Sequence, residues 1–252
     1  MAIDSIAALL SQTEESGLPL WEVILQEDLA EGQSTQEDSL KQMTRLWEAM
    51  KESGDAYRPE ERSRSGLSGG DSAKVQSAME SGRLYGGRFF QEVIAQALRI
   101  SGCNACMKRI VADPPAGSCG VLPAVLLPLL RSGESEEEIL HALYVAAGFG
   151  EVIATRASIS GAEGGCQAEI GSASAMAAAA LVQIRGGAPA MCAHACAMAL
   201  SNLMGRVCDP VAGLVEVPCV HRNVVGAVNA LSCADMALSG VECRIPADEV
   251  ID

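Results

Sequence analysis

Aromatic residues are scarce in this chain of 252 residues, at 3% of the sequence. β-Sandwiches and β-barrels depend on aromatic and β-branched strands, so both fold classes are disfavoured. Hydrophobic residues still make up 49% and charged residues only 20%, which excludes a mainly disordered or fibrous chain. The core must therefore use small residues that let helices approach closely. We predict an all-α fold, a helical bundle of mostly buried Ala- and Gly-rich helices with functional Gly- and Pro-rich turns.

Positive charge is also scarce, because the formal net charge is −14 at pH 7. No stripe of Lys and Arg is present, which argues against nucleic acid or an anionic membrane surface as a partner. The first 62 residues hold 14 acidic and 5 basic residues. We therefore expect an acidic N-terminal helical region, 1–62, packed on a body of residues 63–252, or one continuous domain over 1–252.

The chain has no cationic start followed by an apolar signal segment, and its ten cysteines then indicate a reducing, cytoplasmic location. The longest uncharged run, 186–205, has the length of a membrane span. It consists mostly of Ala, Gly, Ser and Cys and includes His194 and Asn202. We expect a buried helix there and no membrane contact.

Lysine is absent after Lys108. Pyridoxal-phosphate enzymes need a lysine for their Schiff base, and only Lys74, beside a Gly-rich turn, is even a weak candidate. A phosphate-binding loop, a dinucleotide fingerprint and a His-Glu-x-x-His zinc motif are also missing. We therefore expect no pyridoxal phosphate.

With these cofactor and metal motifs missing, the cysteines are the remaining candidates for a functional site. Cys103 and Cys106 form a Cys-x-x-Cys pair, but neither a βαβ pattern nor a second pair supports a redox or zinc site, so buried or incidental thiols are favoured. Cys192 and Cys196 lie one turn apart on an Ala-rich helix, where a core position is expected.

Cys166, Cys208 and Cys219 differ, because each lies at a turn or helix start rich in Gly, Pro or Asp. Loop thiols near free backbone amides suit an iron–sulfur cluster. A cluster held by three thiolates leaves one iron open, and an open iron acts as a Lewis acid on a hydroxyl or carboxylate.

Several long motifs occur in order along the chain: SISGAEGGCQAEIG at 158–171, VCDPVAGLVEVPCVHRN at 207–223, SGLSGGDSAK at 65–74, IVADPPAGSCG at 110–120 and NVVGAVNALSCADMALSG at 223–240. With these motifs the chain resembles the iron–sulfur-dependent L-serine dehydratases (L-serine ammonia-lyases), specifically their α subunit or α domain. The resemblance covers almost the whole chain.

The resemblance implies a 4Fe-4S cluster with Cys166, Cys208 and Cys219 as its protein ligands, carried by a catalytic α domain over 63–252. It also implies an oxygen-sensitive lyase of amino-acid catabolism and gluconeogenesis. The open iron would take the hydroxyl of L-serine, and elimination would give pyruvate and ammonia.

Two residues are candidates for the acid–base group that removes the α-proton because of their positions: His221, two residues after Cys219, and Glu163, beside the Cys166 segment. The base could also come from a β partner. The substrate-binding residues that the resemblance suggests are Ser118, Ser158, Ser160, Gly161, Ala162, Arg222 and Asn223.

Two positions depart from the family pattern. Pro115 stands where a hydroxyl-bearing residue is usual, and Arg156 stands where Asn is usual, which affects expectations about the substrate rather than the cluster.

Family members pair this part with a β subunit, so we expect that partner, and a homo-oligomer is possible. Two alternatives stay open: a related iron–sulfur L-cysteine desulfidase, and a non-catalytic iron–sulfur sensor or binding module.

Overall fold

The computed structural model describes residues 4–32, 35–113 and 115–252. Within these ranges the secondary structure is helical and contains no strand, which confirms the predicted all-α class. The α-helices are α1 (Ile6–Ser16), α2 (Leu20–Gly32), α3 (Gln36–Asp55), α4 (Asp71–Glu80), α5 (Arg88–Ala105), α6 (Val121–Arg131), α7 (Glu136–Arg156), α8 (Gly161–Ile184), α9 (Pro189–Ser201), α10 (Cys219–Leu238) and α11 (Ala247–Ile251). Two short 3₁₀ turns, η1 (Ala116–Ser118) and η2 (Val211–Gly213), lie between them.

Local sequence signals explain where several helices begin. The Ser135 side chain accepts a hydrogen bond from the Glu138 backbone N–H, and three glutamates occupy the first turn of α7. Ser and Thr caps of this kind satisfy an otherwise unpaired N–H, and acidic residues there favour the helix dipole. Thr35 caps α3 in the same way, through the N–H of Asp38.

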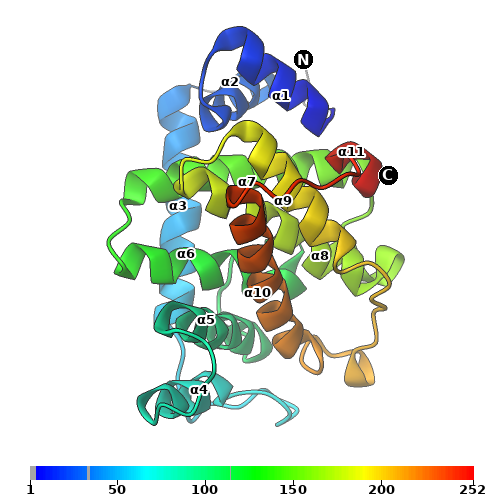
Figure 1. Cartoon of the computed structure of the whole chain (residues 1–252). Helices are drawn as coiled ribbons and strands as arrows, with labels where there is room; N and C mark the ends of the chain where they lie inside the picture. Colours follow the sequence, from blue (N-terminus) through cyan, green and yellow to red (C-terminus); the bar gives the residue numbers. More distant parts are fainter. Residues whose placement is uncertain (1–3, 33–34, 114) are drawn as a thin grey trace.

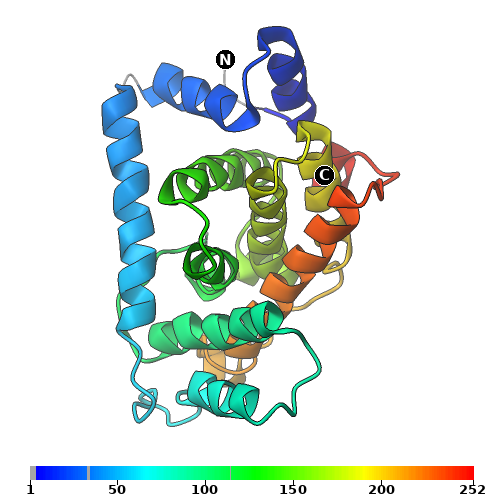
Figure 2. The ribbon, with the colours of Figure 1, turned by 60° about the vertical axis from the view of Figure 1, so that its left-hand side comes forward.

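Helix α8 is the centre of the bundle. It packs most extensively against α7, α9 and α10, and Figures 1 and 2 show it enclosed by these helices. Its buried residues are largely alanines, including Ala173, Ala175 and 177–180. Side chains this small let neighbouring backbones approach closely, which is how the chain builds a core with few aromatics.

The acidic N-terminal helices pack on this core. Ile6, Leu9 and Trp47 are fully buried and belong to the same hydrophobic cluster as the helices of the body. Figure 2 shows α3 as a long helix along one side of the molecule. At the other end of the chain, the Asp248 carboxylate of α11 accepts hydrogen bonds from the backbone N–H groups of Ile6 and Ala7.

Two apolar helices bear on the membrane question. By length and composition alone, helix α7 could cross a membrane. However, 61% of its apolar stretch is buried inside the bundle, as expected of a core helix. Within the run 186–205, helix α9 is likewise packed in the core. Its Cys192 and Cys196 are fully buried, which confirms their predicted core position.

Candidate functional site

Three segments bring the loop thiols to the same end of the bundle. Cys166 lies on α8 directly after Gly165, whose φ of +78° interrupts the helix. A side chain at Gly165 would meet the Arg206 carbonyl oxygen at 2.6 Å, and that oxygen also accepts a hydrogen bond from the Gln167 N–H at 3.2 Å. Only glycine tolerates this backbone and this close approach. The interruption of the helix at Gly165 therefore lets the backbone beside Cys166 contact the segment that carries Cys208.

Arg222 holds the Cys208 segment beside the start of α10. Its Nη1 donates a hydrogen bond to the Val207 carbonyl at 3.1 Å and forms an ion pair with Asp209 Oδ1 at 2.6 Å. Arg222 therefore contacts the residues on both sides of Cys208. The same guanidinium interacts with the Cys166 thiol. Because Cys219 is the first residue of α10, Arg222 lies one turn after it. The three thiols are thus gathered around one arginine.

The electrostatics of this thiol site suit a cationic group. Burial raises the pKa of Cys219 to about 11, with further increases from Glu169, Cys166 and Cys208 nearby. Burial also raises the pKa of Cys166, although Arg222 opposes this shift. Within the described ranges, no three His, Cys, Asp or Glu side chains converge tightly enough to hold a single metal ion. Cysteine thiolates are the usual protein ligands of iron–sulfur clusters, where each thiolate binds a different iron atom.

Glu216 anchors the segment before Cys219 and was not anticipated from the sequence. Its buried carboxylate accepts hydrogen bonds from the hydroxyls of Ser63 at 2.6 Å and Ser65 at 2.7 Å. Burial would raise the pKa of Glu216, but the hydroxyls of Ser63, Ser65 and Ser68 together hold it below its ordinary value. The Gly-rich loop at 65–72 therefore supports the Cys219 segment through Ser65 and Ser68.

The Ser118 turn closes on itself. The buried Ser118 hydroxyl donates to the carbonyls of Asp113 at 3.0 Å and Pro115 at 2.9 Å. The amide of Asn223, on α10, donates to the Gly117 carbonyl at 2.7 Å and accepts from the Gly120 N–H at 2.8 Å. Both side chains are thus occupied in holding the turn against α10, and their roles in substrate binding remain predictions.

Asp113 gives this turn a pH-dependent stability. One carboxylate oxygen accepts from the Leu122 N–H at 2.8 Å, while the other is buried without a hydrogen-bond partner. Burial raises the pKa of Asp113 well above its ordinary value, and the Leu122 hydrogen bond only partly opposes this. The folded state therefore favours the protonated form of Asp113. The contribution of Asp113 to the free energy of unfolding is fully present below the unfolded pKa of about 3.9, and it is lost as pH rises through the higher folded pKa.

We expect Asp113→Asn to weaken that pH dependence. Asparagine can still accept the Leu122 hydrogen bond but cannot ionise, so the variant should lose less stability than the wild type between pH 5 and pH 8. Urea unfolding at several pH values measures this difference. Parallel stability curves for the two proteins would contradict the assignment.

The start of α8 holds the other predicted polar residues. Ser158 Oγ donates to Glu163 Oε2 at 2.9 Å and accepts from the Ser160 N–H at 3.2 Å. Ala162 is exposed, whereas Gly161 is buried and lies against Cys208. The structure thus brings this predicted group to the edge of the thiol site.

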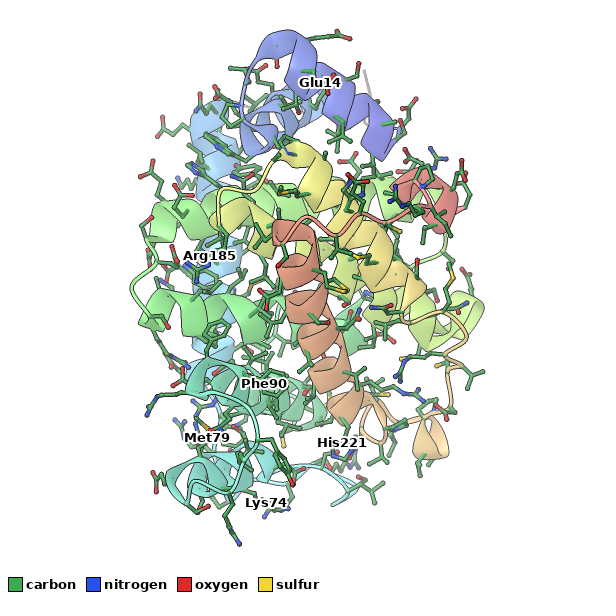
Figure 3. All side chains as sticks on the ribbon, in the orientation of Figure 1. Glu14, Lys74, Met79, Phe90, Arg185 and His221 are labelled. Atoms are coloured by element: carbon green, nitrogen blue, oxygen red, sulfur yellow. The ribbon has the colours of Figure 1, made fainter. Side chains whose placement is uncertain are left out.

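His221 lies at the N-terminal end of α10, two residues after Cys219, and is exposed (Figure 3). Arg156 has a different environment. It forms ion pairs with Asp252 at 2.6 Å and Asp248 at 3.6 Å, so its charge ties the end of α7 to α11. This departure from the family pattern has a structural explanation.

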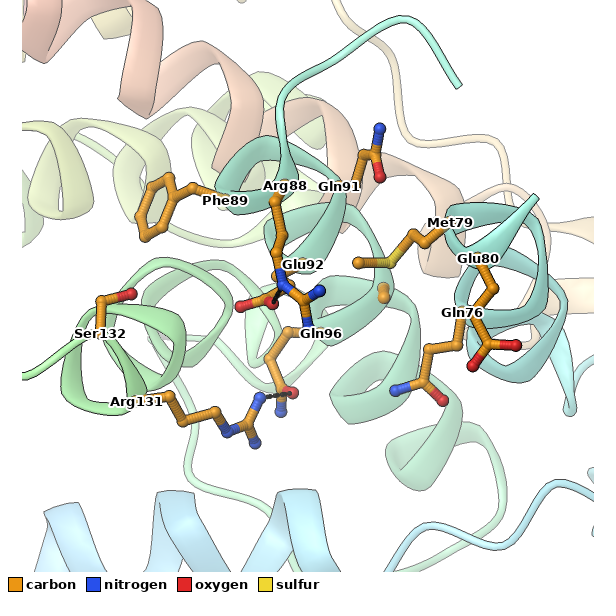
Figure 4. A pocket seen from close by; sticks show the side chains of 11 residues that line it. Gln76, Met79, Glu80, Arg88, Phe89, Gln91, Glu92, Gln96, Arg131 and Ser132 are labelled. Carbon is orange, nitrogen blue, oxygen red and sulfur yellow. Dashed lines mark hydrogen bonds and ion pairs between the residues drawn. The ribbon is translucent and has the colours of Figure 1, made fainter. Parts of the chain in front are cut away.

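A separate cavity of about 900 Å³ lies between α4, α5 and the end of α6, and none of the ten cysteines lines it (Figure 4). Its lining includes Arg131, whose Nη1 donates to Gln96 Oε1 at 3.2 Å. Cys103 and Cys106 also lie outside the set of loop thiols. The buried Cys103 thiol donates a hydrogen bond to the Ser53 carbonyl at 3.3 Å, as a buried thiol without a metal would.

These features define a helical protein in which three cysteine-bearing segments lie around Arg222. Sequence comparison gives the family. The family model described as "Serine dehydratase alpha chain" matches residues 15–252, and the chain belongs to this family.

Similar proteins carry matching names. The chain is 43% identical to "Probable L-serine dehydratase, alpha chain" of Bacillus subtilis, over 98% of this chain and 83% of that one. It is 36% identical to "L-serine dehydratase, alpha chain" of Peptoniphilus asaccharolyticus, over 99% and 86%. It is 42% identical to "L-serine dehydratase TdcG" of Escherichia coli over 62% of this chain, which covers 35% of that protein. The family resemblance inferred from the motifs is thereby confirmed.

Proposed function

We propose that the chain is the α subunit of an iron–sulfur-dependent L-serine dehydratase that works in the reducing cytoplasm and produces pyruvate and ammonia. The observation that carries the proposal is the convergence of Cys166, Cys208 and Cys219 around Arg222 in a member of the serine dehydratase alpha chain family. The names of its relatives specify L-serine as their substrate.

Cys166, Cys208 and Cys219 would hold a 4Fe-4S cluster. When bound, the cluster supplies an open iron whose Lewis acidity lowers the charge that departing hydroxide must carry. The exposure of Cys208 suits this role, because at least one side of the site is open to solvent and to a small substrate.

The remaining steps use groups of the chain itself. His221 would remove the α-proton, and Glu163, held by Ser158, is the second candidate for this role. Loss of the α-proton and the β-hydroxyl releases water and leaves aminoacrylate. Its tautomerisation and hydrolysis then give pyruvate and ammonia. The polar groups at the start of α8 and Arg222 would orient the substrate during this elimination.

A β subunit would cover the thiol face. Several apolar side chains are exposed in the segment from Val207 to Cys219 and in the loop that contacts Glu216. We call them the apolar rim: Leu67, Val207, Val211, Leu214 and Val215. Exposed apolar groups gathered in one place commonly mark an interaction surface. The "alpha chain" names of the relatives imply a second chain in those proteins, and we propose that an equivalent partner docks on the apolar rim.

The direct test is pyruvate formation from L-serine by protein reconstituted with iron and sulfide without oxygen, alone and with a candidate β chain. Stoichiometric iron together with serine-dependent pyruvate would support the proposal. Release of sulfide from L-cysteine in place of pyruvate from serine would favour the desulfidase. Iron uptake without either activity would favour a sensor, and absence of iron would overturn all three.

His221→Asn belongs in the same assay. If His221 removes the α-proton, the variant should keep its iron and its cluster absorbance but lose at least about 100-fold in kcat. Unchanged turnover would dismiss His221 and leave Glu163 or a residue of the β chain.

A further inference from the structure

Glu169 is a carboxylate at the centre of the thiol site. It lies on α8, one turn after Cys166, and its charge acts on the thiols of Cys166, Cys219 and Cys119. Its own hydrogen-bond donor is the Gly117 backbone N–H. Among the described residues, none of the ion pairs includes Glu169. Glu169 is half-buried, and burial raises the pKa of its carboxyl, although the Gly117 hydrogen bond opposes this shift. Ionising a partly buried carboxyl that has no cationic partner is costly, so the site favours a ligand that brings positive charge.

Two glycines make room for this carboxylate. A Cβ at Gly161 would lie 2.8 Å from Glu169 Oε2, and a Cβ at Gly117 would come closer still to Oε1. The Cβ position of Gly161 is also only 3.7 Å from Cys208 Sγ. The carboxylate and the proposed cluster ligand thus both lie within 4 Å of a single point. Backbone without side chains on two sides is the arrangement expected where a small ligand approaches closely.

We propose that Glu169 receives the α-ammonium group of the amino-acid substrate, an inference that rests on the proposed function. L-Serine carries a hydroxyl, a carboxylate and an ammonium. The serine hydroxyl would lie on the cluster side of the site. The serine carboxylate would pair with the Arg222 guanidinium and accept hydrogen bonds from backbone N–H groups. Glu169 supplies the anionic partner that the ammonium requires and the Gly117 N–H keeps its carboxylate oriented. The site would then select amino acids over hydroxy acids.

Glycerate is the probe for this selection, because it keeps the hydroxyl and carboxylate of serine and lacks the ammonium. Binding of L-serine and of L-glycerate to the iron-loaded protein with its β chain is measured by calorimetry in the His221→Asn background, because the active enzyme would consume serine during the titration. A hydrogen-bonded charge contact contributes about 1.5–3 kcal/mol, so Glu169→Gln should bind serine roughly 10- to 100-fold more weakly. Its affinity for glycerate should stay the same or increase. Iron content and cluster absorbance should be unchanged.

Two further variants sharpen the test. Glu151→Gln removes the same charge from α7 and should leave serine binding unchanged, since Glu151 lies among the acidic residues Glu27, Asp28 and Glu31. Gly117→Ala keeps the charge of Glu169 but forces its carboxylate to move, so it should also weaken serine binding. This variant decides the matter if Glu169→Gln fails to take up iron.

Serine binding and a serine-to-glycerate preference that survive in both Glu169→Gln and Gly117→Ala would overturn the proposal. Failure of the proposed function looks different. In that event the wild type would release no pyruvate with its partner chain, whether or not it prefers serine over glycerate in binding.

Discussion

Replacing Cys208 by serine is expected to remove most of the bound iron and to lower pyruvate formation by more than about 100-fold. Loss of a group that only orients a metal ligand already costs about 10- to 100-fold, and loss of a ligand itself should cost more. A serine hydroxyl does not ionise near neutral pH and cannot replace the thiolate. Iron and sulfide per chain, cluster absorbance and pyruvate release measure the effect.

This experiment distinguishes loss of the cluster from loss of the fold, because the Cys208 side chain is exposed and its replacement should not disturb the core. The far-ultraviolet circular dichroism and the unfolding midpoint of the iron-free variant should match those of the wild type. Cys243→Ser is the matched control, since Cys243 is half-buried in the segment before α11 and lies outside the thiol site. It should keep full iron and activity. Iron retained by Cys208→Ser at the wild-type level would contradict the assigned ligand set.

Local sequence signals predict the helices best where a cap or a long apolar run marks them. The spacing around Ser135 and Glu138 predicts the start of α7, and the apolar run from Val121 predicts α6. The start of α10 at Cys219 is hard to predict, because the polar first turn of the helix resembles a loop in sequence.

The thiol site is predictable only in part. Motifs point to the cysteines, but Glu216 meets Ser63 and Ser65 across more than 150 positions, and no local pattern reveals such a contact. Glu169 does have a signal. It lies three residues after Cys166, so a continuous helix would place both on one face. Recognising it required knowing that α8 continues after the interruption at Gly165.

Asn223 links the Ser118 turn to the start of α10, and Asn223→Ala is expected to destabilise the fold by roughly 2–6 kcal/mol. The side chain is fully buried, and its amide joins Gly117 and Gly120 of the Ser118 turn to Cys219 of α10. Alanine leaves the Gly117 carbonyl and the Gly120 N–H buried without partners, and each such group costs about 1–3 kcal/mol. Urea unfolding of the iron-free protein measures the loss.

An isosteric variant and a surface control make the stability test specific. Asn223→Asp keeps the volume and the acceptor for Gly120, but its second oxygen faces two carbonyl oxygens, so it should be at least as unstable as the alanine variant. Asn202→Ala removes an exposed amide that donates to Asn229, and it should cost no more than about 1 kcal/mol. A loss below about 1 kcal/mol in Asn223→Ala would show that the turn finds other partners. The expected large loss would instead mean that the turn facing Glu169 and the helix carrying Cys219 are held in register by one side chain, so the carboxylate and the thiols keep their mutual positions before any cofactor binds.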